Sequence, residues 1–280
     1  MNLFKILKNN NKDKVGLFIL GAQKCGTTSL HYYLSQHPLF LGSQPKETDF
    51  FSYDRYYEKG VDFYHKFFDL NLKQKRLLKF DSSTEYLYIP YCAERIKKYN
   101  PNSKFIIIKR DPVKRAISAY KMYKALSQGE LWSEAYFNRI KMHSSEFESK
   151  MLKLLVRKPF PEFADLIREE VSLTSTSNNE FIYEPSLIAR GNYEHQKKRF
   201  LHYFPKENIF EIDFERYAEN TIEVLNEVLG FLDIKQDFFD ESYDLSIQLK
   251  SRESFFLDTD EYISFRHLFN ENYRNNENDS

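Results

Sequence analysis

The chain has 280 residues with 41 basic and 41 acidic side chains, and it is rich in phenylalanine (26) and tyrosine (20). This length can bury a substantial core in one domain, and the balanced charge gives no overall basic character of the kind that indicates a nucleic-acid partner, so we expect none. The two cysteines, Cys25 and Cys92, are too few for a disulfide framework or a zinc site, so we expect no metal.

The first residues carry no targeting signal. The segment 1–14 is polar and basic without an apolar stretch, so we expect an N-terminal extension and not a signal peptide. No part of the sequence approaches about 18 consecutive apolar residues, the length needed to span a bilayer. We therefore expect a soluble, cytoplasmic protein without a membrane span.

Strands and helices alternate along the chain. The hydrophobic pattern predicts strand 15–20, helix 27–36, strand 77–81, helix 90–99, strand 104–109 and helix 112–126. A helix-rich stretch (131–170) and a polar segment (171–185), a candidate lid, come next, followed by helix 191–203, strand 208–213 and helix 221–232. This order predicts an α/β fold in which helices flank a P-loop-like central parallel sheet. We expect a single domain over 15–270 and a frayed polar tail at 271–280.

A glycine loop follows the first apolar run. Gly21 to Leu30 reads GAQKCGTTSL, between the first expected strand and helix. Such a loop forms an anion site, because unpaired backbone N–H groups and the helix dipole converge at the helix N-terminus. The spacing matches a Walker A loop, but Thr27 stands where that motif has lysine, and Lys24 lies inside the loop. The candidate anion-binding residues are Gln23, Lys24, Cys25, Gly26, Thr27, Thr28 and Ser29.

A second phosphate motif follows the strand expected at 104–109. Asp111 suits the N-cap of the next helix and Pro112 suits its first position. Arg110 ends the strand and Ser118 lies two turns into the helix. The pair could hold one phosphate through a guanidinium fork and a hydroxyl group. We expect both phosphate motifs at the carboxyl ends of adjacent strands, where open α/β sheets bind ligands.

Together, GAQKCGTTSL and RDPVKRAISAY resemble the 5′-phosphosulfate loop and the 3′-phosphate segment of sulfotransferases that use 3′-phosphoadenosine 5′-phosphosulfate (PAPS). Three weaker matches resemble heparan sulfate, other carbohydrate and bacterial members: the segments PKETDFF (45–51), RGNY (190–193) and NEVLGFLDI (226–234). The resemblance covers about residues 15–235. One departure is Phe80 to Tyr86, which reads FDSSTEY where the family often has E-K-[ST]-P-x-Y.

The resemblance implies an enzyme that moves the sulfuryl group of PAPS to a hydroxyl or amine, releases 3′-phosphoadenosine 5′-phosphate (PAP) and needs no metal. It implies that Lys24 stabilises the leaving group, Glu47 is the general base and Lys46 holds the sulfuryl oxygens. It also assigns Tyr193, Lys250 and Arg252 to the nucleotide. His31 and His37 are rival bases, although we expect a packed ring at 31 and a helix-ending turn at 37.

Two other functions remain open at this point. A P-loop kinase or NTPase would fit the loop spacing, but this sequence lacks the Walker lysine and a clear magnesium-holding aspartate. A non-catalytic nucleotide- or glycan-binding protein could use the same fold. The acceptor is left open between a sugar and a small metabolite, O- and N-sulfation are both compatible with the sequence, and the oligomeric state is undetermined.

Overall fold

The computed structural model describes residues 14–68, 78–128, 157–176, 186–240, 242–245 and 257–278. Its contacts divide the chain into two compact units. The first unit comprises residues 1–110 and 196–252, and the second comprises 111–195 and 253–280.

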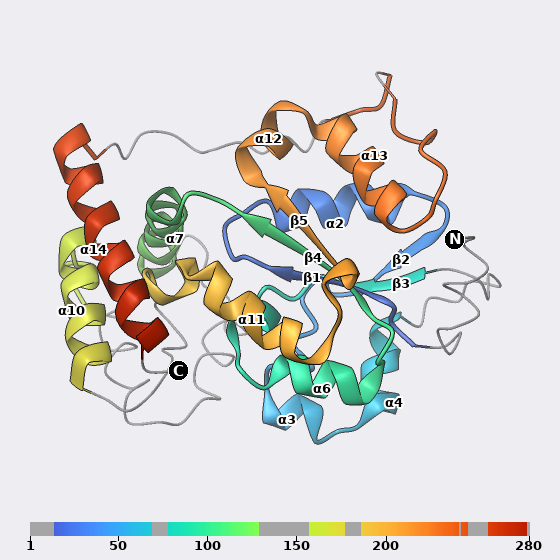
Figure 1. Ribbon diagram of the computed structural model, residues 1–280, viewed down its shortest axis with the longest axis horizontal. Coiled ribbons are helices and arrows are strands. Elements are labelled where there is room, and N and C mark those ends of the chain that lie inside the picture. Colours follow the sequence, from blue (N-terminus) through green and yellow to red (C-terminus); the bar gives the residue numbers. More distant parts are fainter. Residues whose placement is uncertain are drawn as a thin grey trace. The chain divides into compact units, whose positions relative to one another are not determined.

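The first unit contains a parallel β-sheet, as the sequence predicted (Figure 1). The strand order is β2-β3-β1-β4-β5, and every neighbouring pair is parallel. The strands are β1 (Leu17–Gly21), β2 (Phe40–Gly42), β3 (Leu78–Asp81), β4 (Lys104–Lys109) and β5 (Ile209–Asp213).

The two central strands are fully buried, which explains their continuous apolar sequences. Residues 17–20 of β1 and 105–108 of β4 are 0% exposed, as expected for strands covered on both faces. Leu17 pairs with Lys104 and Ile19 pairs with Ile106, so β1 and β4 are direct neighbours. Their carboxyl ends therefore lie at the same edge of the sheet, and the chain continues from them into the glycine loop and Arg110.

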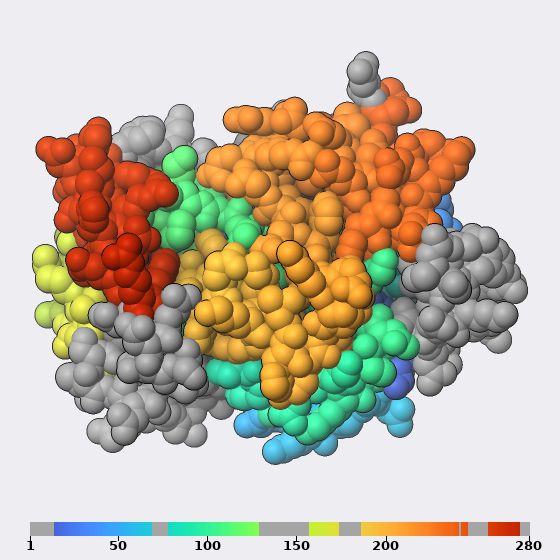
Figure 2. Space-filling view, viewed as in Figure 1, coloured from blue at the N-terminus to red at the C-terminus, as the bar shows by residue number. Residues whose placement is uncertain are grey.

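Helices cover both faces of this sheet. In Figure 1, α2 (Thr27–Gln36), α12 (Phe214–Glu219) and α13 (Thr221–Phe231) lie on one face, and α6 (Cys92–Tyr99) and α11 (Tyr193–Tyr203) lie on the other. The gold and orange surface in Figure 2 belongs to α11, β5, α12 and α13. Short helical turns complete the unit: α3 (Asp54–Tyr57), α4 (Val61–His65), η1 (Lys66–Phe68), α5 (Glu85–Tyr88) and η3 (Lys206–Asn208).

The second unit is helical. It contains α7 (Pro112–Ser127), α10 (Phe163–Thr176), η2 (Ala189–Gly191) and α14 (Thr259–Asn278). Tyr120 and Tyr123 of α7 are buried in one cluster with Phe163 and Phe269. The predicted start of α7 is confirmed, because the Asp111 carboxylate accepts the N–H of the residue three positions later at 2.9 Å and proline occupies the first turn.

Some elements differ from the sequence predictions. The edge strand β2 and the short helix α5 were not predicted, and α14 continues through Asn278 into the stretch expected to fray. The helix expected at 90–99 is α6. Residues 171–176 of the candidate lid belong to α10, whereas 177–185 and most of the helix-rich stretch (131–156) lie outside the described residues. Within the described part of the chain, no helix is long and apolar enough to cross a bilayer.

Candidate active site

The glycine loop turns sharply between β1 and α2. Gly21, Lys24 and Gly26 have φ angles of 145°, 68° and 84°. The backbone N–H of Ala22 donates to the carbonyl oxygen of Ile108 at 2.9 Å, which ties the loop to β4. A lysine in the left-handed region is strained, and such strain clusters at functional sites. Glycine at position 26 has no such penalty, so α2 can begin directly after the turn.

Two side chains of the loop hold its shape. The Ser29 hydroxyl donates to the Gly26 carbonyl oxygen at 2.9 Å and lies 3.2 Å from the Tyr217 hydroxyl. The buried thiol of Cys25 lies 3.7 Å from the Gln23 carbonyl oxygen, and both cysteines of the chain are unpaired by disulfides. Of the other predicted loop residues, Thr27 is buried, Thr28 is exposed, and Gln23 and Lys24 are half-buried.

The N-terminus of α2 suits an anion. Within this fully described helix, no side chain caps the first turn and the first turn holds no acidic residue. The first N–H groups of an α-helix have no partner inside the helix, and the helix dipole adds positive potential at that end. This geometry supports the predicted anion loop.

Arg110 reaches the loop from the end of β4. Its Nη1 lies 3.5 Å from the carbonyl oxygen of Lys24, and its guanidinium lies 4.4 Å from the ring centroid of Phe214. Its Nε is buried and has no hydrogen-bond partner among the described residues. One of the two predicted phosphate-binding side chains thus lies beside the anion loop and has an unused donor. Ser118 is half-buried in α7 of the second unit, so its joint contact with a phosphate stays a prediction.

Lys46 and Glu47 meet the first turn of α2. Lys46 Nζ donates to Glu47 Oε1 at 2.9 Å and to the carbonyl oxygen of Ser82 at 3.2 Å, and it lies 3.4 Å from Thr27 Oγ1. The other carboxylate oxygen of Glu47 lies 3.5 Å from Thr84 Oγ1. The two side chains are 19% and 27% exposed, so solvent and ligands can reach them. The structure therefore brings a partly desolvated lysine–carboxylate pair to the anion loop.

The two histidines considered as alternative bases are both packed against other side chains. His31 is buried, its Nδ1 lies 2.9 Å from Ser82 Oγ, and its ring packs against Phe80. Burial lowers the pKa of His31 to about 4, and the charge of Lys46 adds to this effect while Glu47 opposes it. His37 ends α2 and packs 4.5 Å from the Phe238 ring centroid. The expected packed ring and helix-ending turn are both confirmed.

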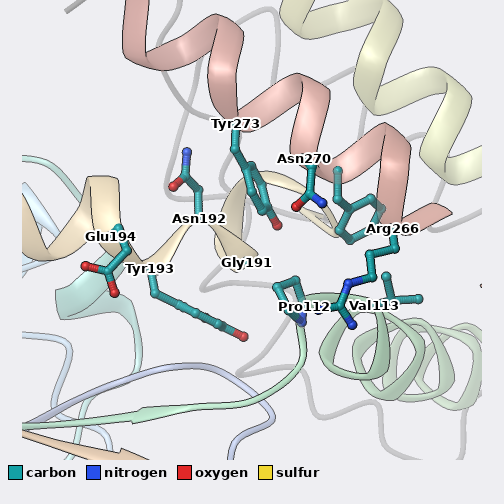
Figure 3. A pocket seen from close by; sticks show the side chains of 10 residues that line it. Pro112, Val113, Gly191, Asn192, Tyr193, Glu194, Arg266, Asn270 and Tyr273 are labelled. Carbon is teal, nitrogen blue, oxygen red and sulfur yellow. The ribbon is translucent and has the colours of Figure 1, made fainter. Parts of the chain in front are cut away.

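Tyr193 lines a pocket of about 270 Å³ in the second unit (Figure 3). Arg266, Asn270 and Tyr273 project toward this pocket from α14, and Tyr193 comes from the opposite side. Gly191 also lines it, and a Cβ at this position would lie 3.0 Å from Pro112 Cβ. The RGNY segment predicted Tyr193, whereas the α14 residues lie on a polar helix that carries no motif and were not predicted.

A buried carboxylate fixes the segment that leads to this pocket. Glu170 of α10 accepts backbone N–H groups from Ile188 at 3.0 Å and from Ala189 at 2.9 Å. The buried guanidinium of Arg115 donates to the carbonyl oxygen of Ser186 at 3.2 Å. These contacts fix the segment 186–189, which leads into the turn at Gly191.

Two predicted nucleotide residues, Lys250 and Arg252, lie outside the described residues. In the part of the chain that the structure describes, no group of three or more His, Cys, Asp or Glu side chains is arranged to hold a metal ion.

Comparison with known proteins identifies relatives over most of the chain. The chain is 26% identical over 266 residues to the membrane-associated sulfotransferase kil1 of Dictyostelium discoideum. This alignment covers 77% of this chain and 55% of the relative. It is 24% identical over 233 residues to human bifunctional heparan sulfate N-deacetylase/N-sulfotransferase 2. That alignment covers 81% of this chain and 23% of the relative. The chain thus spans about half of one relative and about a quarter of the other. Its predicted cytoplasmic location stays a prediction.

A solved structure supports the same relationship. The sulfotransferase of Alicyclobacillus acidocaldarius aligns with a TM-score of 0.59 and 26% identity and covers 92% of each chain. The sequence model of the sulfotransferase domain family matches residues 14–268 of the chain. The chain therefore belongs to the sulfotransferase family.

Proposed function

We propose that this protein transfers the sulfuryl group of PAPS to a hydroxyl or amine of a carbohydrate or small-molecule acceptor. The observation that carries the proposal is the position of the Lys46–Glu47 pair, with Lys46 Nζ 3.4 Å from Thr27 Oγ1 in the first turn of α2. A base and a cation at the edge of an anion loop are what sulfuryl transfer requires. A Walker-type NTPase would instead have its lysine at position 27.

Bound PAPS would supply an activated sulfuryl group on a phosphate leaving group. In the proposed reaction, the acceptor oxygen or nitrogen forms a bond to sulfur while the bond between sulfur and the bridging oxygen breaks, and PAP departs. Glu47 would take the acceptor proton, because its carboxylate is partly desolvated and reachable from solvent. Lys24, inside the loop, would stabilise the charge that grows on the bridging oxygen. Lys46 would hold the sulfuryl oxygens.

The residues present fit the nucleotide. The unused Nε of Arg110 is a donor that a phosphate would satisfy, and a guanidinium suits phosphate oxygens. Ser118 would add a hydroxyl donor to the same 3′-phosphate. The Tyr193 pocket of the second unit has aromatic, amide and guanidinium groups, which suit a purine ring.

The acceptor class is proposed from chemistry and from the relatives. One relative is named as acting on heparan sulfate, which favours a sugar hydroxyl or amine. The acid–base machinery described above would serve a hydroxyl of a small metabolite equally well.

The test compares wild-type protein with Glu47→Gln, and with Glu58→Gln as the control because Glu58 is exposed on the same unit. Labelled PAPS is offered with glucosamine oligosaccharides, phenols and primary alcohols, and PAP binding is measured by calorimetry. We expect Glu47→Gln to bind PAP normally while kcat falls by about 10²–10⁴-fold, the usual contribution of a positioned base. Absence of transfer by the wild type to every acceptor, or Mg²⁺-dependent ATP turnover, would contradict the proposal. A loss of PAP binding in Glu47→Gln would make Glu47 a structural residue.

A further inference from the structure

A buried carboxylate lies at the carboxyl end of β3. Asp81 is 0% exposed and its carboxylate accepts four hydroxyl groups. Thr48 donates at 2.7 Å, Tyr64 and Tyr86 each at 2.8 Å, and Ser83 at 2.7 Å. A buried carboxylate is costly unless such donors satisfy it, so these four hydroxyls account for its presence in the core. We call Asp81 and these four residues the Asp81 hydroxyl cage.

The cage is connected directly to the loop that carries Glu47. Ser83 Oγ donates to Asp81, and the same oxygen accepts the backbone N–H of Thr48 at 2.9 Å and of Asp49 at 3.0 Å. Thr48 is therefore held twice, by its hydroxyl on Asp81 and by its backbone N–H on Ser83. Asp49 has a φ of 53°, so the chain makes a tight left-handed turn at this contact.

The other two members of the cage have different roles. Tyr64 comes from α4, and its ring stacks on Phe50 with centroids 4.6 Å apart. Its hydroxyl donates to Asp81 from outside the loop that carries Glu47. Tyr86 contacts both Asp81 and the loop, because its hydroxyl also lies 2.8 Å from Thr48 Oγ1.

We propose that Asp81 is a positioning residue, which acts through Ser83 and Thr48 to fix the Glu47 carboxylate beside Lys46 and the anion loop. This inference rests on the proposed function. Glu47 is bonded covalently to Thr48, so a backbone shift at Thr48 moves the base. A misplacement of about 1 Å in a catalytic group can lower the rate by about 10²-fold, so the hydroxyls of Ser83 and Thr48 matter for catalysis as well as for folding.

The cage includes a stretch that departs only in part from the family motif. In FDSSTEY, Ser83 keeps the hydroxyl position of E-K-[ST]-P-x-Y and Ser82 stands in place of its lysine, and both serines contact the loop. The carbonyl of Ser82 holds Lys46 and the hydroxyl of Ser83 holds the residues after Glu47. A hydroxyl residue at position 83 is therefore suited to hold the loop, whereas position 82 acts through its backbone.

The experiment separates positioning from general stability. Ser83→Ala and Thr48→Val each remove a hydroxyl that links the cage to the loop, whereas Tyr64→Phe removes a hydroxyl from the same carboxylate without touching the loop. Ser83→Thr keeps the hydroxyl and serves as the conservative rescue. Each variant is measured for Tm, for PAP affinity by calorimetry, and for kcat and KM with an acceptor that the wild type sulfates.

We expect Ser83→Ala and Thr48→Val to lose about 10–100-fold in kcat, with PAP affinity and acceptor KM unchanged. Ser83→Thr should retain most of the wild-type kcat, and Tyr64→Phe should lower Tm while leaving kcat unchanged. Having two variants on the loop side keeps the test decisive if one of them fails to fold.

Equal losses of kcat in Tyr64→Phe and Ser83→Ala would overturn the inference, as would wild-type kcat in both loop-side variants. If the wild type is active, either of these two results refutes only the positioning role. A wild type that transfers nothing from PAPS to any acceptor refutes the proposed function, and the inference falls with it.

Discussion

His31→Asn should remove a pH-dependent part of the folding stability. The His31 ring is 8% exposed, packs on Phe80 and lies near the charge of Lys46. Burial, with a smaller contribution from Lys46, lowers the pKa of this ring from 6.5 to about 4. Asparagine keeps a polar atom near the Nδ1 position that contacts Ser82, but it cannot take up a proton.

The sign follows from proton binding. Between the folded pKa of about 4 and the unfolded value of 6.5, the unfolded chain binds more protons at this site than the folded chain. Stability is therefore fully present above pH 6.5 and is lost as the pH falls toward 4. Each pKa unit is worth about 1.4 kcal/mol, so the contribution of His31 falls by about 2 kcal/mol between pH 7 and pH 5.

The assay is urea unfolding of wild type and His31→Asn at both pH values, with exposed His202→Gln as the matched control. His31→Asn will be less stable at every pH because it loses ring packing, so the informative quantity is the difference between the two pH values. We expect the wild type to lose about 2 kcal/mol more than His31→Asn on acidification. Equal losses in the two proteins would refute the reasoning, since His31 would then titrate alike in the folded and unfolded chains.

Three further results are expected. Lys24→Ala should lower kcat by about 10²-fold or more, as for other charge-stabilising donors, and wild-type turnover would contradict this role. Arg110→Ala should weaken calorimetric binding of PAP much more than binding of AMP, which lacks the 3′-phosphate, and an equal loss would make Arg110 structural. Gly191→Ala should lower the free energy of unfolding by about 1–3 kcal/mol, because its Cβ would overlap the Tyr273 hydroxyl. Tyr273→Phe should recover part of that loss in urea unfolding, and a double variant no more stable than Gly191→Ala would point to Pro112 as the obstacle.

The sequence alone determined the central sheet and its anion loop. The apolar runs that form β1 and β4 are explained by burial on both faces, and this signal is local in the sequence. The cap at Asp111 is local as well, because the capping residue and its N–H partner are three positions apart. The same locality made the glycine loop recognisable before its φ angles were known. Edge strand β2 has only three residues, too few for a period to show.

Only the tertiary structure decided how the candidate site is held. Thr48 and Asp81 are 33 positions apart, and their hydrogen bond exists because β3 ends beside the loop after Glu47. The pocket around Tyr193 depends in the same way on α14, whose polar sequence predicted no function. The pKa of His31 is likewise a product of burial and of a neighbouring lysine brought in by the fold. Contacts between distant segments follow from the packing of the whole chain, so no local pattern of residues encodes them.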